Sequence, residues 1–391
     1  GLLSLVAATL VSVGANEDTD WLGLWLPASQ WGFLCMGAWI AGDRLALRCL
    51  GGSLVIGAVA VGVYAILQYY RLDPLPPVTA FGDERIVAVF ENPNFLGNFA
   101  ACALPLALLV LLQGSTNWHR IVAVLGVGAI YAGGFLAGSR GGWVAGVAGV
   151  LVLGAGVARS IYLGRIRLHW PSLVVLVGLL VALTFLLSRR PVVESRGDSV
   201  TMSERILSTR HIIAPYVESE VPVAAGADSL TPQIEVRDFT VNHRYFIWEV
   251  TWAMIQTRPL VGIGYGNYQK QFTVFRDSRR EDAHFQSLVW TQQQEDTPYA
   301  HNEYLHLWVE SGVLGLVAFL ALVGLAGWEM LKVAWRDASS YLWAGLGIIT
   351  VMLVHSLVSY PLRLPLNGMI FWLALGILVG STRLRQVIAD R

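Results

Sequence analysis

Long apolar runs, separated by short polar or glycine-rich connections, dominate the pattern of hydrophobic and polar positions. A helix needs about 20 apolar residues to cross a bilayer. Nine runs can serve as spans and a tenth, at 2–14, is partial; the nine are 22–42, 49–70, 93–113, 119–138, 141–162, 171–188, 303–330, 341–361 and 366–383. The pattern predicts an all-α membrane protein, a polytopic helical bundle of about ten spans.

The chain opens on Gly1 with the partial apolar run. This run lacks the basic n-region and the cleavage-site pattern of a signal peptide. We therefore interpret the N-terminus as a truncation, with at least one further helix before it.

One long polar stretch interrupts the apolar pattern. Residues 189–300 hold 12 of the 27 Lys/Arg and 14 of the 27 Asp/Glu, so this stretch cannot lie in lipid. The sequence therefore divides into N-terminal transmembrane helices at 1–188, a large loop at 189–302 that contains helices, and C-terminal transmembrane helices at 303–391.

Basic residues gather in alternate connections, and this asymmetry gives the orientation. Loops rich in Lys and Arg stay in the cytoplasm. The large loop then faces the periplasm or the exterior of a bacterial cytoplasmic membrane. The basic set comprises Arg44, Arg48, Arg120, Arg159, Arg165, Arg167, Lys332, Arg336, Arg383, Arg385 and Arg391.

Composition agrees with a lipid environment and narrows the chemistry. Residues are 55% hydrophobic and 14% charged, against about 25% charged in soluble domains. The net charge of zero gives no reason to expect nucleic-acid binding. The three cysteines have no metal-type spacing, and no acidic pair typical of metal-dependent sugar transfer occurs, so we expect neither a metal nor a cofactor.

An aromatic helix is predicted within the large loop, at 242–257. Tyr245, Trp248 and Trp252 fall on one helical face, with Asn242 as N-cap and Pro259 after the end. Such a helix either lies in the membrane interface or packs on a small core of the loop itself. The sequence leaves both interpretations open.

Arg140 and His301 are the leading candidate site residues. Arg140 stands in AGSRGGW at the outer membrane surface, where a charged side chain is usually paired or functional. His301 stands at the outer mouth of the span that begins near Glu303, where an imidazole can exchange a proton near neutral pH. We expect His306 on a different helix face, and His355 inside a span.

Further arginines on the outer side suit an anionic ligand. Arg244 opens the loop helix, where unpaired N–H groups favour negative charge. Guanidinium groups bind phosphate oxygens bidentately, so several facing one cleft would suit a diphosphate. The additional candidates for such a cleft are Arg258, Arg363, Arg205 and Arg210.

The GIGYG segment at 262–266 invites two other interpretations. A dinucleotide-binding glycine loop needs a preceding strand in a βαβ unit, and a potassium filter needs a re-entrant loop between two spans. Neither context occurs around this segment, so we predict a structural turn.

Four segments stand in a characteristic order: NPNFLGNFAACALPLAL at 92–108, AGSRGGWVAG at 137–146, RYFIWEVTWAMIQTRPLVGIGYGNY at 244–268, and AHNEYLHLWVESGVLGL at 300–316. Together they resemble the O-antigen ligase/polymerase superfamily, bacterial polytopic membrane glycosyltransferases of the GT-C type with about twelve spans.

The resemblance implies a glycosyltransferase on the outer face of the cytoplasmic membrane. Its donor would be a glycan on undecaprenyl diphosphate, and its acceptor a hydroxyl of lipid A core, another glycan or a protein, without a metal and with inversion. By residue, Arg140 matches the arginine of the SRG segment, Arg244 the arginine opening the loop helix, and His301 the histidine of the HN motif. The arginines would hold the diphosphate, and His301 would assist the acceptor hydroxyl.

Three alternatives remain open at this point. The first is an O-antigen or exopolysaccharide polymerase of the same superfamily. The second is a secondary transporter of a small anion, which would place polar residues near the midplane of several spans and show inverted repeats. The third is a membrane scaffold whose loop binds cell-wall partners.

Overall fold

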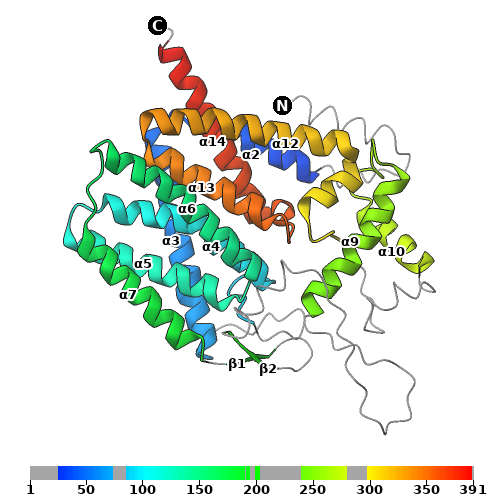
Figure 1. The fold of residues 1–391 in the computed structure, drawn as a ribbon, viewed down its shortest axis with the longest axis horizontal. Helices are drawn as coiled ribbons and strands as arrows, with labels where there is room; N and C mark the ends of the chain where they lie inside the picture. Colours follow the sequence, from blue (N-terminus) through cyan, green and yellow to red (C-terminus); the bar gives the residue numbers. More distant parts are fainter. Residues whose placement is uncertain are drawn as a thin grey trace.

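The structure is a computed structural model and describes residues 25–73, 85–189, 191–193, 199–202, 239–279 and 297–389. Nine helices of this part form a helical bundle (Figure 1). They are α2 (Trp25–Ile40), α3 (Arg44–Tyr69), α4 (Pro93–Gln113), α5 (Asn117–Leu136), α6 (Arg140–Tyr162), α7 (Trp170–Leu187), α12 (Glu303–Asp337), α13 (Ser340–His355) and α14 (Pro365–Ala389).

These helices confirm the predicted all-helical membrane fold. Each of the nine full-length apolar runs coincides with one of them. Six of the described helices are long and apolar enough to cross a membrane, and the apolar parts of α13 and α14 are shorter. The total of about ten spans stays a prediction, and the partial run at 2–14 lies outside the described residues.

Smaller elements connect or flank the bundle. A hairpin of two three-residue antiparallel strands, β1 (Pro191–Val193) and β2 (Ser199–Thr201), follows α7. Two helices of the large loop, α9 (Phe239–Thr257) and α10 (Tyr268–Ser278), lie beside the outer end of α12 (Figure 1). A single 3-10 turn, η3 (Pro361–Arg363), joins α13 to α14.

Helix α4 is the centre of the bundle, because it packs on α5, α6 and α13 and is the most buried of the six long apolar helices. Small residues allow these close approaches, as is usual where helices pack in lipid. Gly97 of α4 faces Ser139 at the start of α6, and Gly149 of α6 faces Gly347 of α13. The helices can therefore pack backbone against backbone.

Several helices begin at the same end of the bundle. Asn92 caps α4, Ser139 caps α6, and Asn302 caps α12, each by a side-chain oxygen that accepts a backbone N–H. The Ser139 hydroxyl also donates to Asn94 Oδ1 at 2.9 Å, which joins the first turns of α4 and α6. Helix N-termini carry partial positive charge, so the first turn of each of these helices favours an anion next to it.

The large loop and the start of α12 share a small hydrophobic core. Residues Phe246, Ile247, Val250 and Met254 of α9 pack in it together with Phe272 of α10 and Val309 of α12. This packing supports the interpretation that the aromatic helix packs on a core, and a position in the membrane interface stays a prediction.

The predicted aromatic face is only partly in that core. Trp252 is about half exposed and packs edge-on against Trp308, with ring centroids 5.5 Å apart. The predicted N-cap is wrong: α9 begins at Phe239, so Asn242 lies inside its first turn.

The GIGYG segment forms the predicted structural turn, seated on a kink in α12. The kink is at Gly312, whose φ of 70° and ψ of 179° are not helical. Ile263 N–H donates to the Val309 carbonyl at 2.8 Å, and Gly264 N–H donates to the Glu310 carbonyl at 3.1 Å. A Cβ on Gly312 would lie 2.0 Å from the Leu260 carbonyl oxygen, so the contact requires glycine there.

A pair of glycines on α6 tests the packing. A Cβ on Gly156 would lie 2.0 Å from the Trp343 ring, whereas a Cβ on Gly154 would meet nothing within 4 Å. We expect Gly156→Ala to lower the free energy of unfolding by about 1–3 kcal/mol through overpacking. The matched variant Gly154→Ala should be neutral or stabilising by up to about 1 kcal/mol, because alanine favours the helix.

Thermal unfolding of the detergent-solubilised variants measures the difference. Equal melting temperatures for the two variants would contradict the packing of α6 on α13.

Candidate functional site

His301 is held in a left-handed backbone conformation, with φ of 49°. Such a φ is uncommon for a residue other than glycine, and it persists only where neighbouring contacts enforce it. Strain of this kind often accompanies functional sites. His301 is therefore positioned by the residues on either side of it.

Both neighbours of His301 are fixed by hydrogen bonds. The Ala300 carbonyl accepts from Trp248 Nε1 at 3.0 Å, and the Ala300 N–H donates to His306 Nδ1 at 3.1 Å. On the other side, Asn302 Nδ2 donates to the Leu357 carbonyl at 3.0 Å, while its Oδ1 caps α12. The HN pair thus combines a positioned imidazole with the cap that anchors it.

The His301 imidazole is partly buried among aromatic rings. Its ring packs edge-on against Tyr360, with centroids 4.9 Å apart, and the His243 ring lies 6.4 Å away. Burial first, and then the charge of Arg244, lowers the pKa of His301 to about 3. The side chain is therefore neutral across the physiological range and can accept a proton.

Arg244 and Arg140 lie at the same end of the bundle as His301. The Arg244 guanidinium acts electrostatically on His301, on Tyr360 and on His355 at the end of α13. Arg140 is buried at the first position of α6. A Cβ on the next residue, Gly141, would lie 3.0 Å from His355 Cδ2, so the start of α6 contacts His355.

The structure consequently brings the three leading candidates, from three different elements, around the end of α13. His355 was expected inside a span, and it is buried at the outer end of α13.

The other predicted cations are placed differently. Arg258 is exposed at the far end of α9, about 21 Å along the helix axis from Arg244 at 1.5 Å per residue. Arg205 and Arg210 lie outside the described residues. Arg363 is buried and does not face outward as expected.

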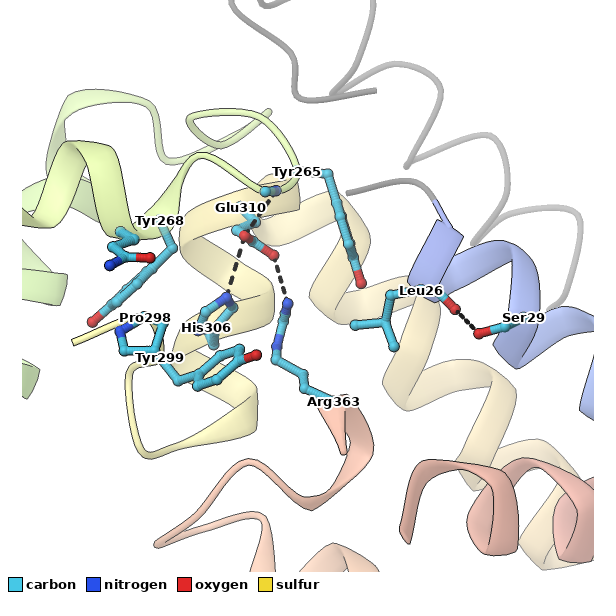
Figure 2. A pocket seen from close by; sticks show the side chains of 11 residues that line it. Leu26, Ser29, Tyr265, Tyr268, Pro298, Tyr299, His306, Glu310 and Arg363 are labelled. Atoms are coloured by element: carbon cyan, nitrogen blue, oxygen red, sulfur yellow. Dashed lines mark hydrogen bonds and ion pairs between the residues drawn. The ribbon is translucent and has the colours of Figure 1, made fainter. Parts of the chain in front are cut away.

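Arg363 is neutralised by two carboxylates. Its Nε lies 3.0 Å from Glu303 Oε1. Its Nη1 lies 2.9 Å from Glu310 Oε2, an ion pair that Figure 2 shows. Burial alone would lower the pKa of Arg363, but the charges of Glu310 and Glu303 hold it above its usual value. A buried arginine persists when it is paired in this way.

His306 and Glu310 extend this pairing to the backbone at His301. His306 Nε2 lies 3.2 Å from Glu310 Oε1, which also accepts the Gly266 N–H at 2.9 Å. Because His306 Nδ1 accepts the Ala300 N–H, the ring proton is on Nε2 and the imidazole is neutral. We call Glu303, His306, Glu310 and Arg363 the outer polar network.

Sequence reasoning missed the roles of His306, Glu303 and Glu310. The spacing of four between His306 and Glu310 places both on one helix face, and this signal could have paired them. The contact with Arg363 has no signal in the sequence, because 60 residues separate Arg363 from Glu303.

A cavity of about 580 Å³ opens beside the outer polar network. Figure 2 shows Tyr268, Pro298 and Tyr299 on one side of the Glu310–Arg363 pair, and Tyr265 with two residues of α2 on the other. We call it the tyrosine cavity; its lining is Leu26, Ser29, Tyr265, Gly266, Tyr268, Gln269, Pro298, Tyr299, His306, Glu310 and Arg363.

Two stacked rings separate this cavity from His301. Tyr299 lines the cavity and stacks on Tyr360, with centroids 4.3 Å apart. Tyr360 in turn contacts His301 by its ring. The Tyr299–Tyr360 pair therefore lies between the cavity and His301.

Within the described residues, no group of three or more His, Cys, Asp or Glu side chains is arranged to hold a metal ion.

The fold and this site define a polytopic helical membrane protein with a buried histidine and arginines at one end of its bundle. The O-antigen ligase family model matches residues 125–320, half of the chain. The chain belongs to the O-antigen ligase family.

A curated relative is the exopolysaccharide production protein ExoQ of Rhizobium meliloti (strain 1021). It is similar to this chain at 23% identity over 334 residues, which are 84% of this chain. The chain spans 65% of the length of that relative.

Two substitutions of His306 test how His301 is held. In His306→Asn the side-chain amide oxygen lies near the position of Nδ1 and can still accept the Ala300 N–H. In His306→Gln the longer side chain places its amide near the position of Nε2, toward Glu310, and does not accept the Ala300 N–H. We expect His306→Gln to speed hydrogen exchange at the Ala300 amide about fivefold, because a hydrogen bond contributes about 1 kcal/mol. His306→Asn should leave this amide protected.

Residue-resolved hydrogen-exchange mass spectrometry measures both variants. If the Ala300 amide exchanged equally fast in the two proteins, His306 Nδ1 would not be what anchors the His301 backbone.

Proposed function

We propose that this protein is a glycosyltransferase that moves a glycan from an undecaprenyl-diphosphate carrier to an acceptor hydroxyl at the outer face of the bacterial cytoplasmic membrane. The observation that carries the proposal is the meeting of Arg140, Arg244 and a neutral His301 at one end of the bundle. Membership of the O-antigen ligase family supports it.

The reaction is a displacement at the anomeric carbon. The acceptor oxygen forms a bond to that carbon, while the bond from the carbon to the diphosphate oxygen breaks. The leaving undecaprenyl diphosphate keeps the electron pair of the broken bond, and the acceptor proton moves to His301. A single displacement inverts the anomeric configuration, and no metal or cofactor takes part.

Arg140 and Arg244 have the role of stabilising the leaving group. Negative charge grows on the diphosphate oxygens in the transition state, and cations already fixed in place stabilise it without reorganising. Arg140 is at the first position of α6, so the positive end of the helix dipole adds to its charge. The prenyl tail can stay in lipid, because this site is at the end of the spans.

His301 has the role of general base, and its environment makes that role depend on the donor. Without ligand, burial and the charge of Arg244 hold the pKa of His301 at about 3, which makes it a weak base. A bound diphosphate would offset the charge of Arg244 and raise this pKa. Proton removal by His301 would then be efficient only when donor is present.

A second candidate function differs from the first in its acceptor, and one observation supports it. The relative from Rhizobium meliloti is named for exopolysaccharide production. This name favours another glycan as acceptor, in which case the enzyme is a polymerase that extends the glycan on its own carrier. The same site chemistry serves both reactions, since each attacks with a sugar hydroxyl.

Substitution of the proposed base and of one arginine tests the proposed function. We expect His301→Ala to slow glycan transfer by about 10²–10⁴-fold through loss of the base, and Arg140→Ala by about 10²–10³-fold through loss of charge stabilisation. The measurement is transfer from a lipid-linked donor to candidate acceptors in reconstituted membranes.

His119→Ala and Arg336→Ala are matched controls, because both side chains are exposed at the opposite end of the bundle. They should transfer at the rate of the parent. Full activity in both site variants would refute the assignment of the site, and absence of transfer by the parent with every acceptor would refute the proposed function.

The pH dependence tests the state of His301. A histidine with a lowered pKa is a competent base above that pKa and loses this capacity only as the pH falls through it. With the pKa of His301 at about 3, kcat/KM should be level from about pH 5 to 7, since this ratio reports groups of the free enzyme. The acid limb of kcat should lie at higher pH, because bound donor raises the pKa.

Initial rates at limiting and saturating donor give the two profiles. An acid limb of kcat/KM centred near pH 6.5 would contradict an enclosed His301.

A further inference from the structure

We propose that the tyrosine cavity binds a neutral sugar at the end of the acceptor glycan, separate from the arginine site that holds the donor diphosphate. The identification of this sugar as part of the acceptor rests on the proposed function. The binding of a neutral sugar is inferred from the cavity, its lining residues and its charge.

The lining has the chemistry that sugar recognition needs. Tyr299 supplies a partly exposed aromatic ring, on which the apolar C–H face of a pyranose can pack. The exposed side chain of Gln269 offers both an acceptor and donors for hydroxyl groups. Its volume of about 580 Å³ is in the range of ligand cavities, about 300–1,000 Å³.

The charge of the outer polar network disfavours a diphosphate. Arg363 is the one cation among the lining residues of this cavity, and it is already paired with Glu310 and Glu303. His306 adds no charge, since its Nδ1 accepts a backbone N–H. One guanidinium beside two carboxylates leaves no excess positive charge, so a neutral ligand fits this cavity better than an anion.

The two sides of the Tyr299–Tyr360 pair therefore differ in the ligand that they suit. Arg140 and Arg244 lie on the His301 side, where the start of α6 adds positive charge. The tyrosine cavity lies on the other side, and Tyr299 is two residues from His301 in the chain. A glycan end seated in the cavity can present a hydroxyl to His301 around the edge of the ring pair.

Residues of α2 also line the cavity. Leu26 and Ser29 line it at the start of this helix, which packs on α14. The cavity is therefore bounded by the helical bundle as well as by the large loop.

Direct sugar binding tests the inference without any transfer reaction. The probes are the α- and β-methyl glycosides of glucose and galactose, observed by saturation-transfer difference NMR on the full chain in nanodiscs. For one ring we expect a Kd on the order of 1 mM. An excess of inorganic pyrophosphate should not displace the sugar.

Matched variants locate the binding site. Gln269→Ala and Tyr299→Leu should weaken binding at least threefold, whereas Tyr299→Phe keeps the ring and should bind as the parent does. Gln271→Ala is the control for Gln269→Ala, because it lies on the same helix and does not line the cavity. Since Gln269 is exposed, its variant gives a result even if Tyr299→Leu fails to fold.

Three results would overturn the inference. They are the absence of binding of all four glycosides to the parent, displacement of the sugar by pyrophosphate, and equal binding by Gln269→Ala and Gln271→Ala.

If transfer failed but these sugars bound as expected, the proposed function alone would be wrong. In a working transfer assay, Gln269→Ala should raise the KM for acceptor at least threefold and leave that for donor unchanged.

Discussion

The contact between the glycine turn and the kink of α12 is the constraint on which the outer end of this protein depends. At Gly312 the helix opens, Gly262 and Gly264 approach its carbonyl groups, and Glu310 turns toward the Gly266 N–H. From Glu310 the pairing continues to His306 and then to the backbone beside His301. The loop, the bundle and the candidate base are therefore one connected unit.

Buried charge is expensive to desolvate, and the outer polar network shows how this chain accommodates it. Arg363, Glu303 and Glu310 are all less than 10% exposed, and each has an oppositely charged partner. Removal of one partner from such a set usually costs more stability than the pair contributes. The network consequently fixes the positions of η3, α12 and the glycine turn, and with them the two regions on either side of the Tyr299–Tyr360 pair.

These two regions offer different chemistry to a ligand. The His301 side combines arginines with a neutral imidazole held in a strained backbone conformation. The cavity side combines tyrosines with a guanidinium that is already neutralised. The proposed transfer, from an anionic lipid-linked donor to a neutral glycan acceptor, needs two such environments close together. A single basic cleft would bind the donor at the acceptor position as well as at its own.

The apolar pattern alone determined the helices, the polar loop and the placement of Arg140 and His301 at the ends of spans, because burial in lipid depends on consecutive residues. The sequence also gave the HN and SRG segments that resemble the family. It could not show that Arg363 is neutralised, that His306 anchors Ala300, or that α9 packs on the loop core with Phe246 and Met254. Tertiary structure decided these features, because ion pairs and packing depend on distances between residues far apart in the chain, and no local pattern encodes those distances.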